Sequence, residues 1–154
     1  MSLTINQDVF PLAQVFTISR GSRTEAKVLS VKISRDGVSG WGECVPYARY
    51  NETAASVSAQ IESLPDAFDR QGLYELLPPG AARNAVDCAL WDLEAKQSGL
   101  RVWQLAGLPA PGPEITAYTL SLDSPENMHA QAAEHAHRPL LKIKLGTPDD
   151  MPRL

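Results

Sequence analysis

The spacing of hydrophobic residues changes along the chain, and the first segment has the period of β-strands. From residue 3 to residue 45, apolar and polar positions alternate, as they do in half-buried strands. The stretch "EAKVLSVKIS" places Leu29, Val31 and Ile33 on one face. The Asp36-Gly37 pair then predicts a tight turn into the partner strand "SGWGECV". We therefore expect this segment to form an antiparallel sheet of about three strands.

The middle segment has helical spacing. The stretch "NETAASVSAQIESLP" offers Asn51 or Thr53 as the N-terminal cap of a helix that stops at Pro65. The stretch "PPGAARNAVDCALWDLEAKQSGL" predicts the clearest helix of the chain, with Gly99 at its C-terminal cap. The Pro- and Gly-rich stretch "VWQLAGLPAPGP" that follows is typical of a linker. It predicts a domain boundary near residue 110.

The last segment alternates strand, helix and strand. "EITAYTLSL" predicts a strand, "DSPENMHAQAAEHAHRP" a helix capped by Ser124, and "LLKIKLG" a second strand. "TPDDM" predicts the start of a further helix, with Thr147 as its cap. This order indicates a parallel sheet covered by helices. Because two parallel strands do not complete a sheet, we expect it to continue beyond Leu154.

Composition narrows the function classes. The net charge of −4 and the pI of 5.3 provide no basic surface for nucleic acid or anionic lipid. No apolar run approaches the ~18 residues that a membrane span needs, and the N-terminus does not read as a secretory signal. Cys44 and Cys88 lie far apart, so we expect two reduced thiols in a cytoplasmic protein, with Cys88 packed on the apolar side of its helix.

The lysine pair in "LLKIKLG" is the leading chemical candidate. Residues two apart in a strand share a face, so Lys142 and Lys144 point to one side and the apolar residues between them to the other. One interpretation is a solvated edge strand whose lysines discourage aggregation. The other is that the sheet closes into a barrel, with helices over the apolar side and both ammonium groups inside. Burial and a neighbouring like charge each lower the pKa of a lysine, which suits Lys144 to act as a base.

Further candidates lie in loops and at strand ends. The polar stretch "FTISRGSRTE" predicts a loop, and its Arg20 and Arg23 fit either a solvated turn or a mobile lid that binds a substrate carboxylate. Thr119 lies near the end of the first parallel strand, and Tyr50 lies in a second loop; each also fits ordinary packing. The three histidines lie on a polar helix without metal-ligand spacing, so we expect them to be solvated.

Four stretches in this order resemble one known family: "ISRGSRTEAKV", "GWGECVPYARYNET", "GAARNAVDCALWDLEAKQSG" and "LLKIKLG". They resemble the N-terminal portion of enolase-superfamily proteins of the muconate-lactonizing subgroup, and most of all the L-Ala-D/L-Glu (dipeptide) epimerases. The resemblance implies an α+β capping domain over residues 1–110. It also implies that residues 111–154 are the first two strands of a modified (β/α)₈ barrel.

The resemblance also implies a reaction. A proton α to a carboxylate would be removed from a dipeptide and returned, with Mg²⁺ stabilising the enediolate. Lys144 would be the base or acid on one face, supported by Lys142. Arg23 in the specificity loop would pair with a substrate carboxylate, with Arg20 beside it, and Tyr50 and Thr119 would line the pocket. The metal ligands and the opposing lysine would lie beyond Leu154, so we expect no metal site in this chain and no activity from it alone.

Two alternatives remain open. The first is another superfamily substrate, such as a muconate-type lactone, o-succinylbenzoate or an N-acylamino acid. The second is a module without catalysis that binds an acidic ligand through Arg20 and Arg23. The expected partners are a small dipeptide or carboxylate substrate. A second copy of the chain or a complementing C-terminal piece would pair with the open sheet edge.

Overall fold

A computed structural model describes all 154 residues, which separate into two compact units. The first unit contains Met1–Val9 and Lys27–Pro111, and the second contains Phe10–Ala26 and Gly112–Leu154. The chain therefore passes between the units in the Pro- and Gly-rich stretch and also within its first hairpin. The sequence pattern does not reveal the division inside the hairpin, because strand alternation continues through it.

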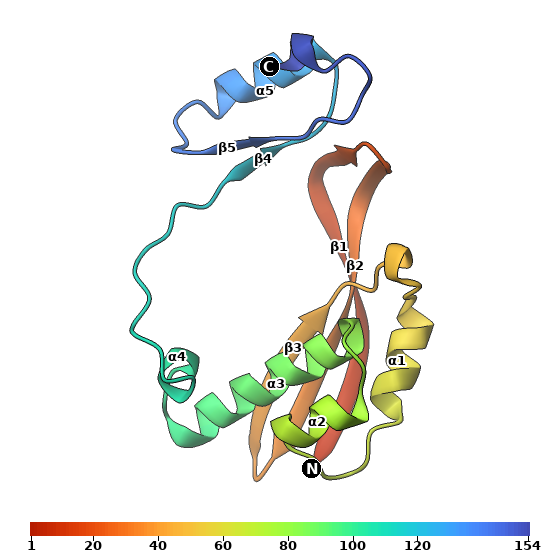
Figure 1. Cartoon of the computed structure of the whole chain (residues 1–154), viewed down its shortest axis with the longest axis vertical. Helices are drawn as coiled ribbons and strands as arrows, with labels where there is room; N and C mark the ends of the chain where they lie inside the picture. Colours follow the sequence, from red (N-terminus) through yellow and green to blue (C-terminus); the bar gives the residue numbers. More distant parts are fainter. The chain divides into compact units, whose positions relative to one another are not determined.

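Three strands form an antiparallel sheet in the order β1-β2-β3 (Figure 1). They are β1 (Ser2–Ile18), β2 (Gly21–Arg35) and β3 (Val38–Cys44). The predicted turn between β2 and β3 is confirmed, because Arg35 pairs with Val38 across two residues with positive φ, Asp36 at 53° and Gly37 at 79°. Positive φ at both central positions is the geometry of a two-residue turn that matches the twist of the flanking strands.

The loop predicted for residues 16–25 is wrong. β1 continues to Ile18 and β2 begins at Gly21, so Ser19 and Arg20 alone make the turn. Pairing between the strands satisfies their backbone groups, and the polar side chains are carried on the strands themselves. Arg20 therefore lies in the turn, and Arg23 lies on β2.

The two main helices of the first unit are confirmed. Thr53 caps α1 (Ala54–Glu62) through a reciprocal pair of hydrogen bonds with Ser56. The long helix α3 (Ala81–Ser98) ends at Gly99, which has a left-handed φ of 71°. Three short helices were not predicted from the sequence: η1 (Ala48–Tyr50), α2 (Arg70–Leu76) and α4 (Val102–Leu105). Segments of three to seven residues are too short to establish a helical period.

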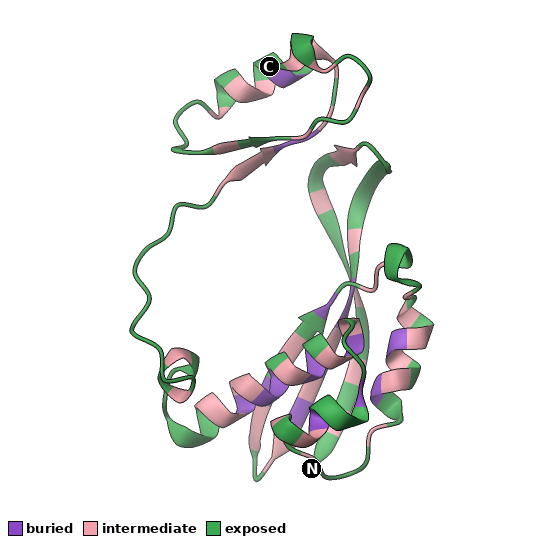
Figure 2. Cartoon of the chain, in the orientation of Figure 1, coloured by how far each residue is buried: buried purple, intermediate pink, exposed green.

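The core of the first unit lies between the sheet and the helices α1, α2 and α3, where the buried residues gather (Figure 2). α3 contributes an apolar stripe to it: Ala82, Ala85, Val86, Ala89, Leu90 and Leu93. Cys44 is buried in this core, whereas Cys88 is exposed, so the expected burial of Cys88 is wrong. Cys88 follows Ala85 by three positions but lies beyond the edge of the stripe.

Two glycines let α3 approach β3 closely. A Cβ atom built on Gly40 would lie 2.5 Å from the backbone nitrogen of Leu93 and overlap the carbonyl oxygen of Ala89. A Cβ atom on Gly42 would overlap the carbonyl oxygen of Ala85 in the same way. Because the obstructing atoms are helix backbone, they cannot move aside as a flexible side chain would. Both positions therefore require glycine.

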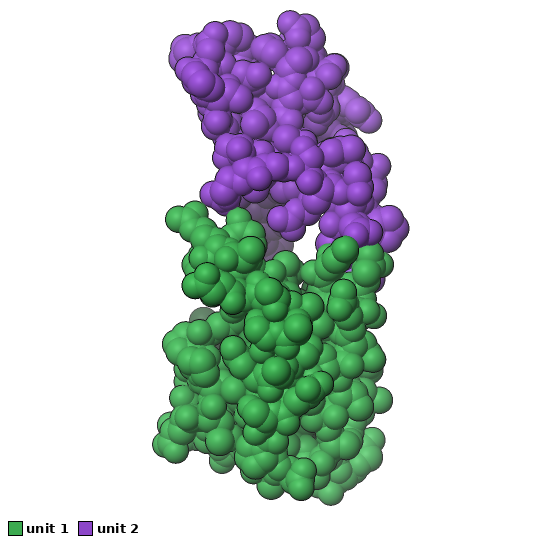
Figure 3. Space-filling view, turned by 90° about the vertical axis from the view of Figure 1, so that its right-hand side faces the viewer, with its two compact units in different colours: residues 1–9, 27–111 green, residues 10–26, 112–154 purple.

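The second unit, coloured purple in Figure 3, contains the predicted β-α-β order. Strand β4 (Tyr118–Leu120) pairs in parallel with β5 (Leu141–Ile143), and α5 (Pro125–Glu134) connects them. Ser124 caps α5 as predicted, with Pro125 in its first turn. Both strands are shorter than expected, because neither has a second neighbour to extend the ladder. The 154 residues hold this one parallel pair and no closed barrel.

The helix predicted to start at Thr147 is wrong. The carboxylate of Asp150 accepts hydrogen bonds from the backbone N–H groups of Gly146 and Thr147 and from the Thr147 hydroxyl. These bonds lower the pKa of Asp150, with the Thr147 hydroxyl as the largest cause. The segment closes into a turn, followed by the short 3₁₀ helix η2 (Met151–Arg153). No helix in the structure combines the length and apolar character needed to cross a bilayer.

We expect Gly42→Ala to lower the free energy of unfolding by about 2 kcal/mol, because the added methyl group meets helix backbone. Urea unfolding followed by circular dichroism measures the change. Gly112→Ala is the matched control, since a Cβ there has no neighbour within 4 Å. Equal unfolding midpoints for the two variants would contradict the close packing of α3 on β3.

Candidate functional site

The parallel strand pair places two candidate residues side by side. Thr119 on β4 is the register partner of Lys142 on β5, so the two side chains leave the same face of the sheet. The N–H of Lys144 donates to the carbonyl oxygen of Leu120 at 3.3 Å, one hydrogen bond beyond the end of β5. Thr119 and the lysine segment are thus held together by backbone hydrogen bonds.

The burial of this segment differs from the expectation. Lys142 is exposed and Lys144 is half-buried. On the opposite face Ile143 and Leu145 are 39% and 38% exposed, so the expected helical cover over these residues is absent. The reason is that α5 covers β4, where Leu120 and Met128 are buried, and no other helix of the chain lies over β5. These residues alone do not enclose the two ammonium groups.

The tip of the β1–β2 hairpin is fastened to the C-terminal end of β4. Buried Ser121 donates through its hydroxyl to the carbonyl oxygen of Val15 at 3.2 Å and accepts from the N–H of Thr17 at 3.3 Å. The N–H of Leu122 donates to the carbonyl oxygen of Thr17 at 3.1 Å. These three hydrogen bonds bring the segment that carries Arg20 and Arg23 to the strand ends.

A second contact involves the hairpin turn and the residues after β5. A Cβ atom built on Gly146 would lie 2.5 Å from the Cβ of Ser19, and the φ of Gly146 is +141°. Only glycine fits both the contact and this backbone conformation. The turn that carries Arg20 therefore lies against the loop that follows Lys144.

A pocket of about 590 Å³ opens between the hairpin and β4, entirely within the second unit. It brings together Arg23 and Thr119, two residues predicted to line a substrate site. Arg20, Lys142 and Lys144 are not among its lining residues. The pocket is lined by Leu12, Ala13, Gln14, Phe16, Arg23, Ala26, Tyr118, Thr119, Glu134 and His135.

His135 in this pocket is not solvated as predicted. Its ring contacts that of Tyr118 in a tilted arrangement at a centroid distance of 4.0 Å, and its Nδ1 atom is buried without a hydrogen-bond partner. The Arg138 guanidinium covers the Tyr118 ring at 4.3 Å. His129 and His137 are exposed, as expected. The sequence contains no signal for this cluster, because Tyr118 on β4 is far in sequence from His135 and Arg138, which follow α5.

Tyr50 lies in the first unit, on η1, and is 69% exposed. Its ring contacts that of Tyr47 at 5.7 Å, and together they border a pocket of about 600 Å³ that also reaches Cys44 and Asn84. Burial raises the pKa of the Cys44 thiol to about 11, with a smaller contribution from the charge of Glu52. This thiol is therefore not suited to act as a nucleophile near neutral pH.

The loop of Tyr47 and Tyr50 is held to the start of α3 by one carboxylate. Glu52 accepts from the N–H of Tyr47 at 3.1 Å and from the N–H of Ala81 at 2.7 Å. Asn51 closes the loop with a left-handed φ of 58°. The position of Tyr50 thus depends on α3, the helix that packs on the glycines of β3.

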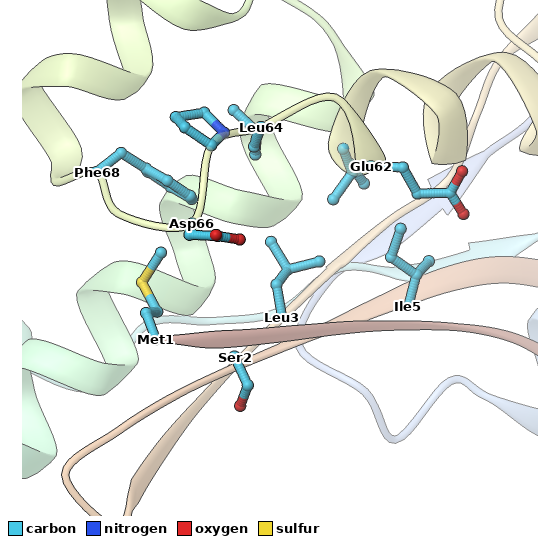
Figure 4. A pocket seen from close by; sticks show the side chains of 10 residues that line it. Met1, Ser2, Leu3, Ile5, Glu62, Leu64, Asp66 and Phe68 are labelled. Carbon is cyan, nitrogen blue, oxygen red and sulfur yellow. The ribbon is translucent and has the colours of Figure 1, made fainter.

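A further pocket of about 450 Å³ lies at the start of β1 (Figure 4). Leu3 and Ile5 on β1 face the segment that carries Leu64, Asp66 and Phe68 (Figure 4). None of the predicted site residues lines it. This pocket therefore does not belong to the candidate site.

The side chains present do not form a metal site. No group of three or more His, Cys, Asp or Glu residues lies close enough together to hold an ion. A divalent cation such as Mg²⁺ requires several oxygen ligands, and Asp149 and Asp150 near β5 do not supply such a set.

The first unit, an antiparallel sheet with helices on one face, has the arrangement of an α+β capping domain. The chain belongs to the mandelate racemase / muconate lactonizing enzyme family, whose N-terminal domain matches residues 1–107. This finding confirms the family inferred from the sequence motifs.

Curated relatives include enzymes that act on two kinds of substrate. The chain is 43% identical to the L-Ala-D/L-Glu epimerase of Escherichia coli strain K12 over 94% of this chain and 47% of that protein. It is 41% identical to the N-acetyl-D-glutamate racemase of a Pseudoalteromonas species over 75% of this chain and 38% of that protein. The chain thus spans about half the length of the curated relatives it matches or less.

The chain is also similar to solved structures related to dipeptide epimerases, and it again spans about half of their length. An enolase family member from Agrobacterium tumefaciens with homology to dipeptide epimerases, solved with sodium, L-Ala-L-Glu and an ordered loop, is 52% identical with a TM-score of 0.92. The match covers 98% of this chain and 48% of that one. A dipeptide epimerase from Enterococcus faecalis V583, complexed with Mg and L-Leu-L-Tyr, is 27% identical with a TM-score of 0.86 over 98% and 47% of the two chains.

We expect Ser121→Ala to release the hairpin tip, because the change removes both side-chain hydrogen bonds to residues 15 and 17. Hydrogen exchange at the Thr17 amide should become about tenfold faster. Ser22→Ala is the matched control, since the Ser22 hydroxyl bonds to the Thr17 hydroxyl and not to the Thr17 amide. Equal exchange at Thr17 in the two variants would show that Ser121 does not hold the tip.

Proposed function

We propose that these residues are part of a dipeptide epimerase of the L-Ala-D/L-Glu type. The observation that carries the proposal is the 43% identity to the Escherichia coli epimerase over 94% of this chain. The shared pocket of Arg23 and Thr119 supports it, because an arginine beside a strand end suits a ligand that carries a carboxylate. The activity is proposed for a whole protein of the relatives' length.

Lys144 is the proposed base on one face of the substrate. Its neutral amine takes the proton from the carbon α to the carboxylate, and the electron pair of that C–H bond moves into the carboxylate as an enediolate. Lys142 in its ammonium form lies beside it in the ladder and interacts with the carboxylate oxygens. Return of a proton on the other face requires an acid that we place outside these residues.

Arg23 is the proposed anchor for the side-chain carboxylate of a glutamate substrate. A guanidinium presents its donors in a planar fork that matches two carboxylate oxygens. Arg20 in the neighbouring turn adds positive charge, and Thr119 lines the same pocket as Arg23. Tyr50 on η1 is proposed to border the substrate site in the assembled enzyme.

We propose that Mg²⁺, if used as in the Enterococcus faecalis complex, is held by residues outside these 154. The side chains present do not form a site for it. We therefore assign none of the residues named here to the metal, and the roles of Lys144, Lys142 and Arg23 rest on their own chemistry.

The second unit is proposed to begin a (β/α) barrel, with residues 1–110 as the capping domain. The parallel ladder and the exposed Ile143 and Leu145 support this, because a further parallel strand and helix beside β5 would cover them. Such a strand is proposed to come from a complementing segment or from a second copy of the chain. The 154 residues alone are expected to be inactive, since they lack an acid for the second face.

A racemase of N-acylated glutamate is the second candidate. It is favoured by the 41% identity to the Pseudoalteromonas racemase. The chemistry at the α-carbon would be the same, and the substrate would lack the free ammonium group. A protein of this kind would exchange the α-proton of N-acetylglutamate faster than that of L-Ala-L-Glu.

We expect Lys144→Ala in the whole protein to slow deuterium uptake at the glutamate α-carbon of L-Ala-L-Glu by about 10²- to 10⁴-fold, because the base is removed. Mass spectrometry of the dipeptide in deuterium oxide with Mg²⁺ measures the rate. Lys96→Ala, on the exposed side of α3, is the control and should exchange like the wild type. Wild-type exchange in Lys144→Ala would reject the assigned role.

We expect Arg23→Gln to raise the KM for L-Ala-L-Glu by about 10- to 100-fold, because an ion pair with the side-chain carboxylate is lost. The KM for L-Ala-L-Ala should change little, since that dipeptide has no side-chain carboxylate. Steady-state kinetics of the whole protein with both dipeptides measures the difference. An equal rise in KM for both substrates would show that Arg23 stabilises the hairpin and does not bind the side-chain carboxylate.

A further inference from the structure

A crevice of about 340 Å³ in the first unit lies between α2 and the first turns of α3. Tyr74 on α2 forms one wall, and Pro79 and Gly80 connect the two helices beneath it. The other wall is one face of α3: Arg83, Asn84 and Asp87. The crevice adjoins the pocket of Tyr50 at Pro79, Gly80 and Asn84, whereas Tyr74, Arg83 and Asp87 line the crevice alone.

Asp87 brings an unsatisfied acceptor to this crevice. Its side-chain oxygen Oδ1 is buried and has no hydrogen-bond partner. Asn84, which also lines the crevice, directs its amide to the carbonyl oxygen of Glu43 at 3.4 Å. Leaving a buried carboxylate oxygen without a donor is costly. Because Asp87 lines the crevice, a cationic group bound there would offset part of this cost through its charge, without touching the buried oxygen itself.

The Arg83 guanidinium makes only one weak hydrogen bond within the protein. It lies over the Tyr74 ring at 5.0 Å, and its one hydrogen bond is to the carbonyl oxygen of Leu77 at 3.5 Å, the limit of such a bond. A guanidinium carries five N–H donors in a rigid fork. The cation is thus held in place by the ring while most of its donors remain open to a carboxylate.

These two opposite charges are not paired with each other, although they lie one turn apart on α3. Four helical residues advance by about 6 Å along the axis. An extended dipeptide spans about 7 Å, since each residue spans roughly 3.5 Å, so its two ends can reach two side chains that leave the helix this far apart. The two charges of a single α-amino acid are closer together than this.

We propose that the crevice binds a short zwitterion of dipeptide length, with its ammonium at Asp87 and its carboxylate at Arg83. Tyr74 covers the middle of the ligand with an apolar face, and a volume of about 340 Å³ admits a dipeptide with small side chains. A simple cation would be repelled by Arg83, and a simple anion would leave Asp87 unsatisfied. The inference does not depend on the proposed epimerase activity.

The test uses the 154-residue chain and glycylglycine as the probe, followed by ¹H–¹⁵N NMR titration. We expect saturable shifts at Tyr74, Arg83 and Asp87. N-acetylglycylglycine, which lacks the ammonium, and glycylglycinamide, which lacks the carboxylate, should each bind about tenfold more weakly or worse. Glycine, whose charges are closer together, should also bind about tenfold more weakly.

Two substitutions assign the charges. Asp87→Asn and Arg83→Gln should each weaken glycylglycine binding about tenfold or more, and Asp87→Asn should abolish the preference for a free ammonium. Glu94→Gln is the matched control, because it also removes a negative charge from α3 but pairs with Arg70 outside the crevice. Circular dichroism checks the fold of each variant, and Arg83→Gln on the surface carries the test if Asp87→Asn does not fold.

Three results would overturn the proposal. One is the absence of saturable binding by glycylglycine at millimolar concentration. Another is equal binding of glycylglycine and its acetylated form. The third is binding that both substitutions leave unchanged, which would place the dipeptide elsewhere on the chain.

Discussion

The close approach of α3 to β3 is the contact on which the first unit depends. It requires Gly40 and Gly42 on the strand, because any side chain there would meet the backbone of the helix around Ala85 and Ala89. The helix in turn carries much of the core. A constraint of this kind fixes both the distance and the rotation of α3, since neither backbone can yield by a rotamer change.

Several features that bear on function follow from the position of α3. Its first N–H groups include that of Ala81, which Glu52 joins to the loop of Tyr47 and Tyr50. Its outer face carries Arg83 and Asp87, the two charges of the crevice beside α2. A single packed helix thus places an aromatic loop at its start and a polar crevice along its first turns.

The sequence predicted most of the regular structure and less of the site. Caps and turns act through local backbone geometry, so a few neighbouring residues suffice to predict them. This holds for Gly99, Thr53 and the Asp36-Gly37 pair. The lengths of β1 and β2 could not be predicted from the sequence, because pairing between the two strands extends them through a polar stretch. The turn at Thr147 depends on the Asp150 side chain, which overrides the helix signal of Thr147 and Pro148. The crevice could not be predicted, because Arg83 and Asp87 line it only together with Tyr74, which lies on a different helix.

The family assignment rests on the N-terminal domain that matches residues 1–107. The proposed chemistry rests on the lysine segment and the hairpin tip beside it. A crystal structure of the whole protein with L-Ala-L-Glu bound would test the proposed roles of Lys144 and Arg23 together. We expect the Nζ atom of Lys144 to lie about 3–3.5 Å from the glutamate α-carbon, with Arg23 on the side-chain carboxylate. A ligand bound elsewhere, with both lysine amines in open solvent, would contradict these roles.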